Sequence, residues 1–403
     1  MDQVITLSTH NEEAEFKARI AKTLAYYVAF VALGLAGVTL GPTLQGLADN
    51  TATRLSEISF LFVARSLGYM AGSLLGGRLY DRRRGHPVVA TMFVIMAATL
   101  FLVPLIPLLW LLVAVLLVLG AAEGAVDVGG NTLLVWVHGS RVGPFMNGLH
   151  FCWGLGAFLS PILIAQAVLL SGDITLAYWL IGGLMFLPII GLLRLPSPLS
   201  HKDATGRPNA PADPRLLVLI VAFFVLCVGG ESIFGGWIFT YAVALGVTDR
   251  ITAAYLTSLF WGALTLGRLL SIPLAARFEP RTILLVDLLG CITSVALIVL
   301  LPGIREVVWL GTFGMGVFMA SMFPTMISYS ERRMTITGQI TSLFLVGAAA
   351  GGMTLPWLVG QLFEVIGPRV TMVIALTDLL LGLAIFAGLV LTSSRRTVRP
   401  LAD

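Results

Sequence analysis

Two acidic residues and one amide share a regular spacing inside a long apolar stretch of the chain. The stretch contains Glu123-Gly-Ala-Val-Asp127-Val-Gly-Gly-Asn131, so the three polar residues are four positions apart. On a helix, this spacing places them on one face. Two neighbouring carboxylates in an apolar environment repel each other when both are ionised, so one of them should hold a proton near neutral pH. We therefore expect Asp127 and Glu123 to couple to an ion. The alternative is that Arg65 neutralises Glu123 and that Asn131 makes a helix contact.

A second candidate site combines an acid with aromatic residues among glycines, in Gly229-Gly-Glu-Ser-Ile-Phe-Gly-Gly-Trp-Ile-Phe-Thr-Tyr241. The glycines weaken a helix and admit a ligand or another backbone. Sugars are bound by hydrogen bonds from polar groups and by aromatic faces, and Glu231, Trp237 and Tyr241 supply both. The alternative is a protonated Glu231 in a helix contact, and a lone His150 can equally be a packing residue. The candidate substrate-binding residues are Asn131, Asn147, His150, Glu231, Trp237 and Tyr241.

The composition defines the environment of these groups. The chain has 403 residues, of which 57% are hydrophobic and 11% charged. Its mean hydropathy is +0.94. It has too little polar surface to cover a soluble globule, so we expect a lipid bilayer as its solvent. The net charge of +4 is spread over short loops, which argues against nucleic acid as a partner.

Nothing in the sequence indicates an enzyme, a metal site or a cofactor. There is no glycine-rich phosphate loop ending in Lys-Ser/Thr, and no serine or cysteine nucleophile motif. Cys152, Cys227 and Cys291 lie in apolar stretches without metal-ligand or disulfide spacing.

Apolar runs long enough to cross about 30 Å of hydrocarbon predict twelve membrane helices. Helices are expected because every backbone polar group of a span must be satisfied within it. The predicted spans are roughly 23–47, 56–77, 87–107, 109–137, 144–170, 174–194, 215–245, 251–276, 282–302, 306–329, 337–363 and 370–392. Matching depths in two spans lead us to expect an ion pair between Arg268 and Asp287. Asp378 in the last span has no role in this scheme.

The basic residues predict the orientation. With the N-terminus in the cytoplasm, 19 of the 25 basic residues fall on the cytoplasmic side and four on the other. Both termini are therefore expected on the cytoplasmic side of the inner (plasma) membrane. Five prolines among polar residues mark a linker at 195–214. The expected organisation is a cytoplasmic segment 1–22, a six-helix bundle 23–194, the linker 195–214, a six-helix bundle 215–392 and a cytoplasmic tail 393–403.

The two halves carry a weak internal repeat. Gly156 followed by Pro161-Ile-Leu-Ile-Ala-Gln166 returns 195 residues later as Gly351 followed by Pro356-Trp-Leu-Val-Gly-Gln361. Such a repeat predicts a parallel duplication, with a binding site between the halves near the membrane midplane. Span two also carries glycines four apart, at positions 68, 72 and 76, which allow close helix contact. They fit either a sliding contact with a helix of the other half or static packing.

The segment Gly77-Arg-Leu-Tyr-Asp-Arg-Arg-Arg-Gly-His86 joins spans two and three. Its Gly-x-Leu-x-Asp-Arg-x-Arg-Gly spacing resembles the loop between the second and third helices of the major facilitator superfamily of secondary transporters. The resemblance implies a gate at the cytoplasmic side. The gating residues expected here are Gly77, Arg78, Asp81, Arg82 and Gly85.

Further motifs narrow the resemblance. They are Leu40-Gly-Pro-Thr-Leu44, Gly130-Asn131-Thr-Leu-Leu, Leu149-His-Phe151, Gly230-Glu231 with Gly236-Trp-Ile-Phe-Thr-Tyr241, and Met322-Phe-Pro-Thr325. Together they resemble the branch of fucose:proton symporters and sodium-dependent glucose transporters, the second group more closely. In the fucose symporters, a fourth-helix carboxylate followed four residues later by Asn carries proton coupling, and Asp127 with Asn131 stands in that place. Their first-helix aspartate is replaced by Val38, which speaks against fucose specificity and an identical coupling scheme.

These observations predict an all-α membrane protein with twelve transmembrane helices in two pseudo-symmetric six-helix bundles. We expect a monomer that moves a small polar solute, with a hexose favoured, by alternating access. Proton coupling is slightly favoured over sodium. One alternative is an exporter of amphipathic drugs or lipids in the same fold. The other is a receptor that binds sugar without moving it.

Overall fold

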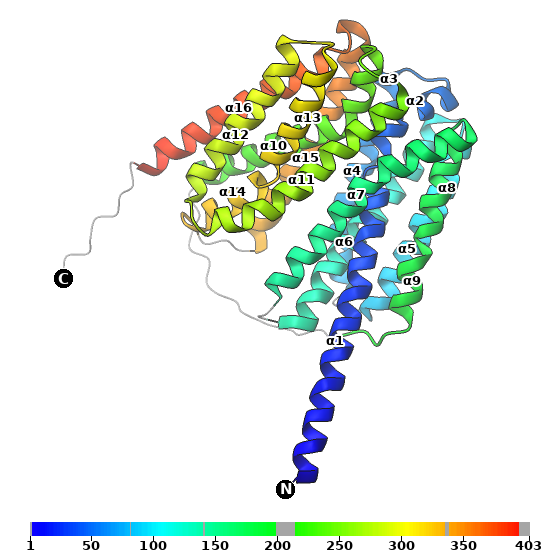
Figure 1. The fold of residues 1–403 in the computed structure, drawn as a ribbon, viewed down its shortest axis with the longest axis vertical. Helices are drawn as coiled ribbons and strands as arrows, with labels where there is room; N and C mark the ends of the chain where they lie inside the picture. Colours follow the sequence, from blue (N-terminus) through cyan, green and yellow to red (C-terminus); the bar gives the residue numbers. More distant parts are fainter. Residues whose placement is uncertain (1, 81, 140–141, 199–213, 335–337, 395–403) are drawn as a thin grey trace, which may run out of the picture. The chain divides into compact units, whose positions relative to one another are not determined.

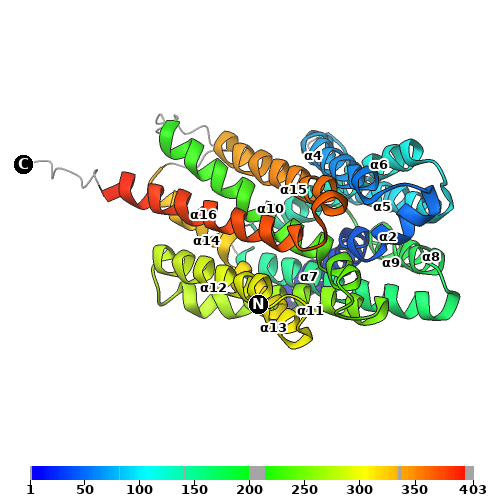
Figure 2. The ribbon, with the colours of Figure 1, turned by 90° about the horizontal axis from the view of Figure 1, so that it is seen from above.

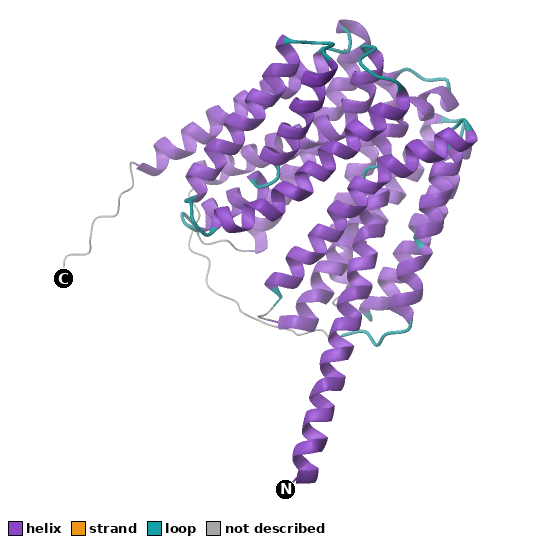
Figure 3. Cartoon of the chain, in the orientation of Figure 1, coloured by secondary structure: helices purple, strands orange, loops and turns teal. Residues whose placement is uncertain are grey.

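The computed structural model describes residues 2–80, 82–139, 142–198, 214–334 and 338–394. Within these ranges the chain is helical and contains no strand, as Figure 3 shows. The elements are α1 (Asp2–Gly37), α2 (Leu40–Thr51), α3 (Leu55–Ile58), α4 (Phe60–Tyr80), α5 (Gly85–Leu102), η1 (Val103–Leu105), α6 (Leu109–His138), α7 (Gly143–Ser171), α8 (Thr175–Leu184), α9 (Phe186–Leu193), α10 (Pro214–Ala244), α11 (Arg250–Ala275), α12 (Pro280–Leu300), α13 (Arg305–Met319), α14 (Met322–Glu331), α15 (Gly338–Ile366) and α16 (Val370–Ser394).

The predicted membrane spans are confirmed. In the described part of the chain, 12 helical segments are long and apolar enough to cross a bilayer. Several spans are built from two consecutive helices, such as α3 with α4 and α13 with α14. The first predicted span breaks between α1 and α2. Pro42 explains this break, because proline lacks a backbone N–H and its ring clashes with the carbonyl four residues earlier, at Val38.

The chain forms two compact units. The first contains residues 1–39 and 67–204, and the second contains residues 40–66 and 205–403. In the first unit, α1 packs along α7 and α6, and α5 packs against α6, α8 and α9 (Figure 1). In the second, α10 lies beside α15 and α16, as both ribbon views show, and α13 packs against α11 and α12 (Figure 2). The segment 40–66, which comes from spans one and two, belongs to the second unit. The predicted bundle boundaries at 23–194 and 215–392 stay a prediction.

The internal repeat corresponds to repeated packing. A Cβ atom on Gly156 of α7 would collide with the backbone oxygen of Val31 on α1. A Cβ atom on Gly351 of α15 would collide with the backbone oxygen of Val225 on α10. The fifth span therefore touches the first, and the eleventh touches the seventh, through the same repeated glycine. This agreement supports a duplication of one helix-packing pattern.

The glycines of α4 make close contacts with α6 within the first unit. Added Cβ atoms on Gly68 and Gly72 would collide with the backbone oxygens of Leu117 and Ala121 on α6, and one on Gly76 would lie 3.1 Å from the Cα atom of Ala125. The sliding contact with a helix of the other half stays a prediction. The stripe lets α4 and α6 pack backbone to backbone.

Candidate functional site

The carboxylate of Asp127 is held on both sides. The Tyr69 hydroxyl donates a hydrogen bond to Asp127 Oδ2. The Asn131 Nδ2 atom donates to Asp127 Oδ1 at 3.1 Å and to the Asp127 backbone oxygen at 2.8 Å. Asp127 is half-buried and Tyr69 keeps 38% of its surface exposed, so the group is reachable. The expected pairing of Asp127 and Asn131 along α6 is present.

Tyr69 is the site residue that the sequence did not indicate. It reaches Asp127 because α4 and α6 touch at Gly124, one turn before the acid. A Cβ on Gly124 would collide with the Tyr69 backbone oxygen and lie 2.8 Å from Ser73 Oγ. Small residues four apart in both stretches, at 68 and 72 and at 120 and 124, could have indicated this helix pair.

His150 joins the surroundings of Asp127 from α7. Its imidazole lies within electrostatic range of the Asp127 carboxylate. The ring also packs edge to face on Phe30 of α1, with 6.1 Å between centroids. Asn147, one turn earlier on α7, is exposed. Glu123, one turn before Asp127, is 4% exposed and thus more deeply buried than its neighbour. The first unit therefore places Tyr69, Asn131 and His150 around the Asp127 carboxylate.

Glu231 lies in the second unit, on α10. Its side chain is half-buried, and Arg268 of α11 lies within electrostatic range of it. Asp287 of α12 accepts a hydrogen bond from the Ser321 hydroxyl. This region therefore shows an electrostatic interaction between Arg268 and Glu231 and a hydrogen bond from Ser321 to Asp287. The expected ion pair between Arg268 and Asp287 stays a prediction.

Trp237 and Tyr241 are packing residues in this conformation. Trp237 is 0% exposed, and its Nε1 donates a hydrogen bond to the Pro356 backbone oxygen at 3.0 Å. The indole packs against Phe62 and Phe363, with ring centroids 6.2 and 5.2 Å away. Tyr241 is likewise buried. Contact with a solute would require these neighbours to move, so the predicted sugar contacts of both residues stay predictions.

The predicted gating segment is partly described. Asp81 lies outside the described residues. Arg78 and Arg82 are exposed, and Gly85 is buried against the Leu133 side chain. Among the described residues, no side chain or other helix lies within 4 Å of the position that a Cβ on Gly77 would occupy. The gating role of this segment stays a prediction.

His86 ties the end of this segment to the start of the central linker. The buried imidazole makes a hydrogen bond with the Tyr26 hydroxyl at 2.8 Å through Nε2. Its Nδ1 lies 2.9 Å from the Leu195 backbone oxygen. The His86 backbone N–H donates to Ser197 Oγ at 3.0 Å. The chain just after the sixth span is therefore fixed to the beginning of the third.

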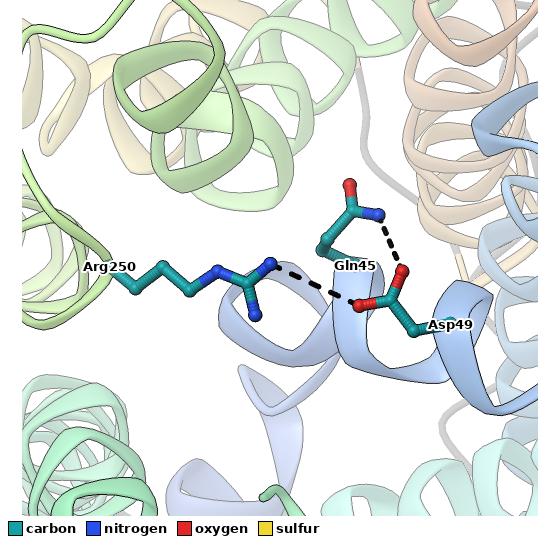
Figure 4. A network of polar contacts seen from close by, with 3 residues as sticks. All are labelled: Gln45, Asp49 and Arg250. Carbon is teal, nitrogen blue, oxygen red and sulfur yellow. Dashed lines mark hydrogen bonds and ion pairs between the residues drawn. The ribbon is translucent and has the colours of Figure 1, made fainter. Parts of the chain in front are cut away.

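Polar contacts at the other end of α4 hold segment 40–66 to the second unit. Asp49 accepts a hydrogen bond from Gln45 at 3.0 Å and forms an exposed ion pair with Arg250 at 4.0 Å (Figure 4). We call the contacts of α3 with α15, made by the residues at 55, 56, 59, 361 and 364, the outer clasp. The sequence did not indicate either set of contacts.

The outer clasp uses one amide and one carboxylate of α15. Gln361 Nε2 donates to the Ser56 backbone oxygen at 2.7 Å and to Ser59 Oγ at 3.2 Å. Glu364 accepts from the Leu55 backbone N–H at 2.9 Å, which satisfies a free donor at the start of α3. The Ser56 hydroxyl also donates to Glu364, at 3.4 Å.

Comparisons with known proteins agree with this architecture. The sequence is 35% identical over 358 residues to sodium-dependent glucose transporter 1 of Xenopus laevis, covering 81% of this chain and 73% of that protein. It is 32% identical over 372 residues to the Homo sapiens protein of the same name, covering 83% and 72%. The crystal structure of the nucleoside transporter NupG matches with a TM-score of 0.76 at 15% identity, covering 92% of this chain and 99% of that one.

The profile of the Major Facilitator Superfamily matches residues 26–356, which include most of the described helices. This match covers both the Asp127 region and the Glu231 region. The family consists of transporters rather than enzymes. The chain is therefore a multi-pass membrane transporter, and it belongs to the major facilitator superfamily.

Proposed function

We propose that this transporter moves a hexose and couples its movement to the binding of a proton at Asp127. The observation that carries this proposal is the pair of hydrogen bonds that Tyr69 and Asn131 donate to the two carboxylate oxygens of Asp127. The names of the 30–35% identical relatives support a sugar as the solute.

The donor set around Asp127 favours a proton over a sodium ion. Sodium, a hard cation, is surrounded by oxygen acceptors, whereas Asp127 is surrounded by an O–H and an N–H that donate to it. Such donors stabilise the ionised carboxylate and orient it. When the carboxyl takes up a proton it becomes neutral, and its attraction to His150 is lost. Proton binding thereby changes the contacts among α4, α6 and α7.

Sodium coupling is the second candidate, and a different observation favours it. The relatives of Xenopus laevis and Homo sapiens are both named sodium-dependent. In that case Asp127 would supply one anionic oxygen to the cation, and Tyr69 and Asn131 would turn their oxygens toward it. The two candidates differ in which gradient drives uptake.

The remaining parts of the scheme follow from the same proposal. Asn131, Asn147, His150 and Glu231 contact the solute. Trp237 and Tyr241 also contact the solute when its binding site is open. The gating segment 77–86 closes the cytoplasmic side. The protein acts as a monomer in the plasma membrane, with both termini on the cytoplasmic side. It consists of the bundles 23–194 and 215–392, which are joined by the linker 195–214.

Transport by reconstituted vesicles tests this proposal. Radiolabelled hexoses are offered under an imposed pH gradient, an imposed sodium gradient, or neither. We expect accumulation with the pH gradient in the wild type, and exchange without accumulation in Asp127→Asn, because the amide mimics the neutral acid. Accumulation that persists in Asp127→Asn would contradict the coupling role. Accumulation that follows sodium alone would establish the second candidate.

Efflux of an amphipathic dye, without hexose transport, would instead support a drug or lipid exporter. Hexose binding without uptake or exchange would support the receptor alternative. A thermal-shift panel of sugars identifies the solute beforehand, because a ligand that binds only the folded state raises its apparent stability.

A further inference from the structure

Asp378 is a buried acid to which the scheme above gives no role. It lies on α16 with 4% of its surface exposed. In the described part of the chain, no donor forms a hydrogen bond with its Oδ1 atom. A buried carboxylate without a partner is costly when ionised, because burial removes its hydration without replacing it. An acidic residue within a membrane span that has an oxygen without a hydrogen-bond donor is a candidate for a functional residue.

A glycine on the neighbouring helix makes room for this carboxyl group. A Cβ atom on Gly230 of α10 would come within 2.7 Å of Asp378 Oδ2, and the Met319 methyl group would lie 3.6 Å away. The carboxyl group therefore lies against the α10 backbone, one residue before Glu231. Glu231 itself is half-buried, so it is the more accessible of the two acids.

The groups around Asp378 do not supply it with a counter-charge of its own. Acid and thiol groups lie on both packing helices, at Glu231 and Cys227 on α10 and at Asp287 and Cys291 on α12. Cys227 lies within electrostatic range of Glu231, Asp378, Asp287 and the Arg268 guanidinium of α11, which defines a shared cluster. On α15, Glu364 contacts α3 instead.

The three acids of this cluster differ in their partners. Glu231 has the field of Arg268, and Asp287 has the Ser321 hydroxyl as a donor. In the described residues, Asp378 Oδ1 has no hydrogen-bond donor. Ionising all three acids would place three negative charges against one guanidinium, and the last ionisation would be the least compensated. The geometry therefore selects Asp378 as the acid that keeps an exchangeable proton.

We propose that Asp378 is a proton-binding site in the second unit, separate from Asp127, and that it exchanges its proton by way of Glu231. This inference rests on the proposed proton-coupled function and extends it to a second proton. Release of that proton adds a negative charge to the acids around Cys227, which increases their attraction for Arg268. The protonation state of Asp378 thereby changes the electrostatic surroundings of Glu231, the acid that we propose contacts the solute.

Infrared titration of the full chain in lipid vesicles tests this site without a solute. The carbonyl stretch of a protonated carboxyl group is followed while the pH is changed, in the wild type, Asp378→Asn and Asp127→Asn. We expect Asp378→Asn to lose one pH-dependent carboxyl band that Asp127→Asn retains. An identical set of bands in the wild type and Asp378→Asn would overturn the proposal.

Gly230→Ala keeps the site testable if Asp378→Asn does not fold. Its Cβ would displace only the end of a flexible side chain, so we expect the fold to survive. The Asp378 carboxyl group must shift, so the midpoint of its band should change while the band itself remains. An unchanged midpoint would overturn the proposal. Transport by Asp127→Asn tests the coupling scheme, whereas the infrared bands of Asp378→Asn test this site. Failure of the coupling scheme and failure of this site are therefore distinguishable.

Discussion

Gln361 on α15 donates a hydrogen bond from Nε2 to the backbone oxygen of Ser56 on α3, at 2.7 Å, across 305 positions of sequence. The bond joins the eleventh span to the beginning of the second. It gives segment 40–66 a specific attachment to the second unit, in addition to the packing of α2 on α10. Because α3 and the predicted gating segment 77–86 lie at opposite ends of the second span, this attachment is made at the end of the span that is opposite the predicted cytoplasmic gate.

Loss of this attachment should expose α3. In Gln361→Ala, two hydrogen bonds to α3 are lost, which weakens its attachment by about 1 kcal/mol, or about five-fold in its opening equilibrium. The measurement is the thiol-labelling rate of a single cysteine at Ile58, which is fully buried. Gln45→Ala is the matched control, since the Gln45 amide contacts Asp49 rather than α15. Equal labelling rates in the two variants would contradict a holding role for Gln361.

Removal of the Tyr69 hydroxyl should change the pH dependence of transport. Tyr69→Phe keeps the ring but removes the donor to Asp127, so the ionised carboxylate becomes less stable relative to the neutral acid. We expect the midpoint of the transport pH profile to move upward by about one pH unit. Tyr27→Phe is the control, because the Tyr27 hydroxyl donates to the Phe145 backbone oxygen instead. A profile that moves equally in both variants would show that the effect is not specific to Asp127.

A methyl group at Gly124 should separate α4 from α6. In Gly124→Ala the new Cβ collides with the Tyr69 backbone, and we expect a loss of about 1 to 3 kcal/mol in the free energy of unfolding. Thermal unfolding in detergent measures this. Gly183→Ala on α8 is the control, since its Cβ would meet no atom within 4 Å. Comparable melting temperatures for the two variants would argue against the close α4–α6 contact.

Asp249 should make the stability of α11 depend on pH. Its side chain caps the helix, accepting hydrogen bonds from the backbone N–H groups of Ile251 and Thr252 at 2.9 Å each. Hydrogen bonds from the backbone and the hydroxyl group of Thr252 hold the pKa of this exposed carboxyl below its usual value. A lowered pKa in the folded state means that the stabilisation is present above the unfolded-state pKa of about 3.9 and is lost as the pH falls through the folded-state pKa.

Asp249→Ala should therefore destabilise the protein by about 1 kcal/mol near neutral pH. Its difference from the wild type should shrink as the pH falls below about 4. Asp249→Asn keeps a capping side chain without a titrating group, so its stability should stay close to that of the wild type at neutral pH. The measurement is the melting temperature as a function of pH. A constant difference between Asp249→Ala and the wild type at all pH values would contradict a role for the ionised cap.

The sequence predicted what depends on local pattern. Apolar length determines a membrane span, so the number of spans was predicted, and the spacing of Asp127 and Asn131 on α6 follows from helical periodicity alone. The repeat of Gly156 and Gly351 also indicated the duplication, because close helix contact requires a small residue at one position. These are properties of a single helix and of its nearest partner.

The contacts that the sequence did not predict join residues far apart in the chain. Tyr69 and Asp127 are 58 positions apart, and Glu364 and Leu55 are 309 apart. Periodicity indicates that a face is buried but not which helix covers it, which is why the partner of the α4 glycines remained open. Trp237 shows a related difficulty, because an aromatic residue beside glycines has the same pattern whether it borders a solute site or fills the space between α10 and α15.

The hydrogen bonds of His86 have a practical consequence for dividing the polypeptide. If the two halves are expressed as separate polypeptides, a cut after Ser197 keeps both contacts of His86 with the start of the linker, namely the Leu195 backbone oxygen at Nδ1 and the Ser197 hydroxyl at the backbone N–H. A cut directly after the sixth span would remove the Leu195 partner of the ring and the Ser197 partner of the His86 backbone N–H, and it would leave the ring its hydrogen bond with the Tyr26 hydroxyl. The last residues of α9 and the few that follow it therefore belong to the first half as an inseparable piece, and a fusion tag is better inserted further downstream.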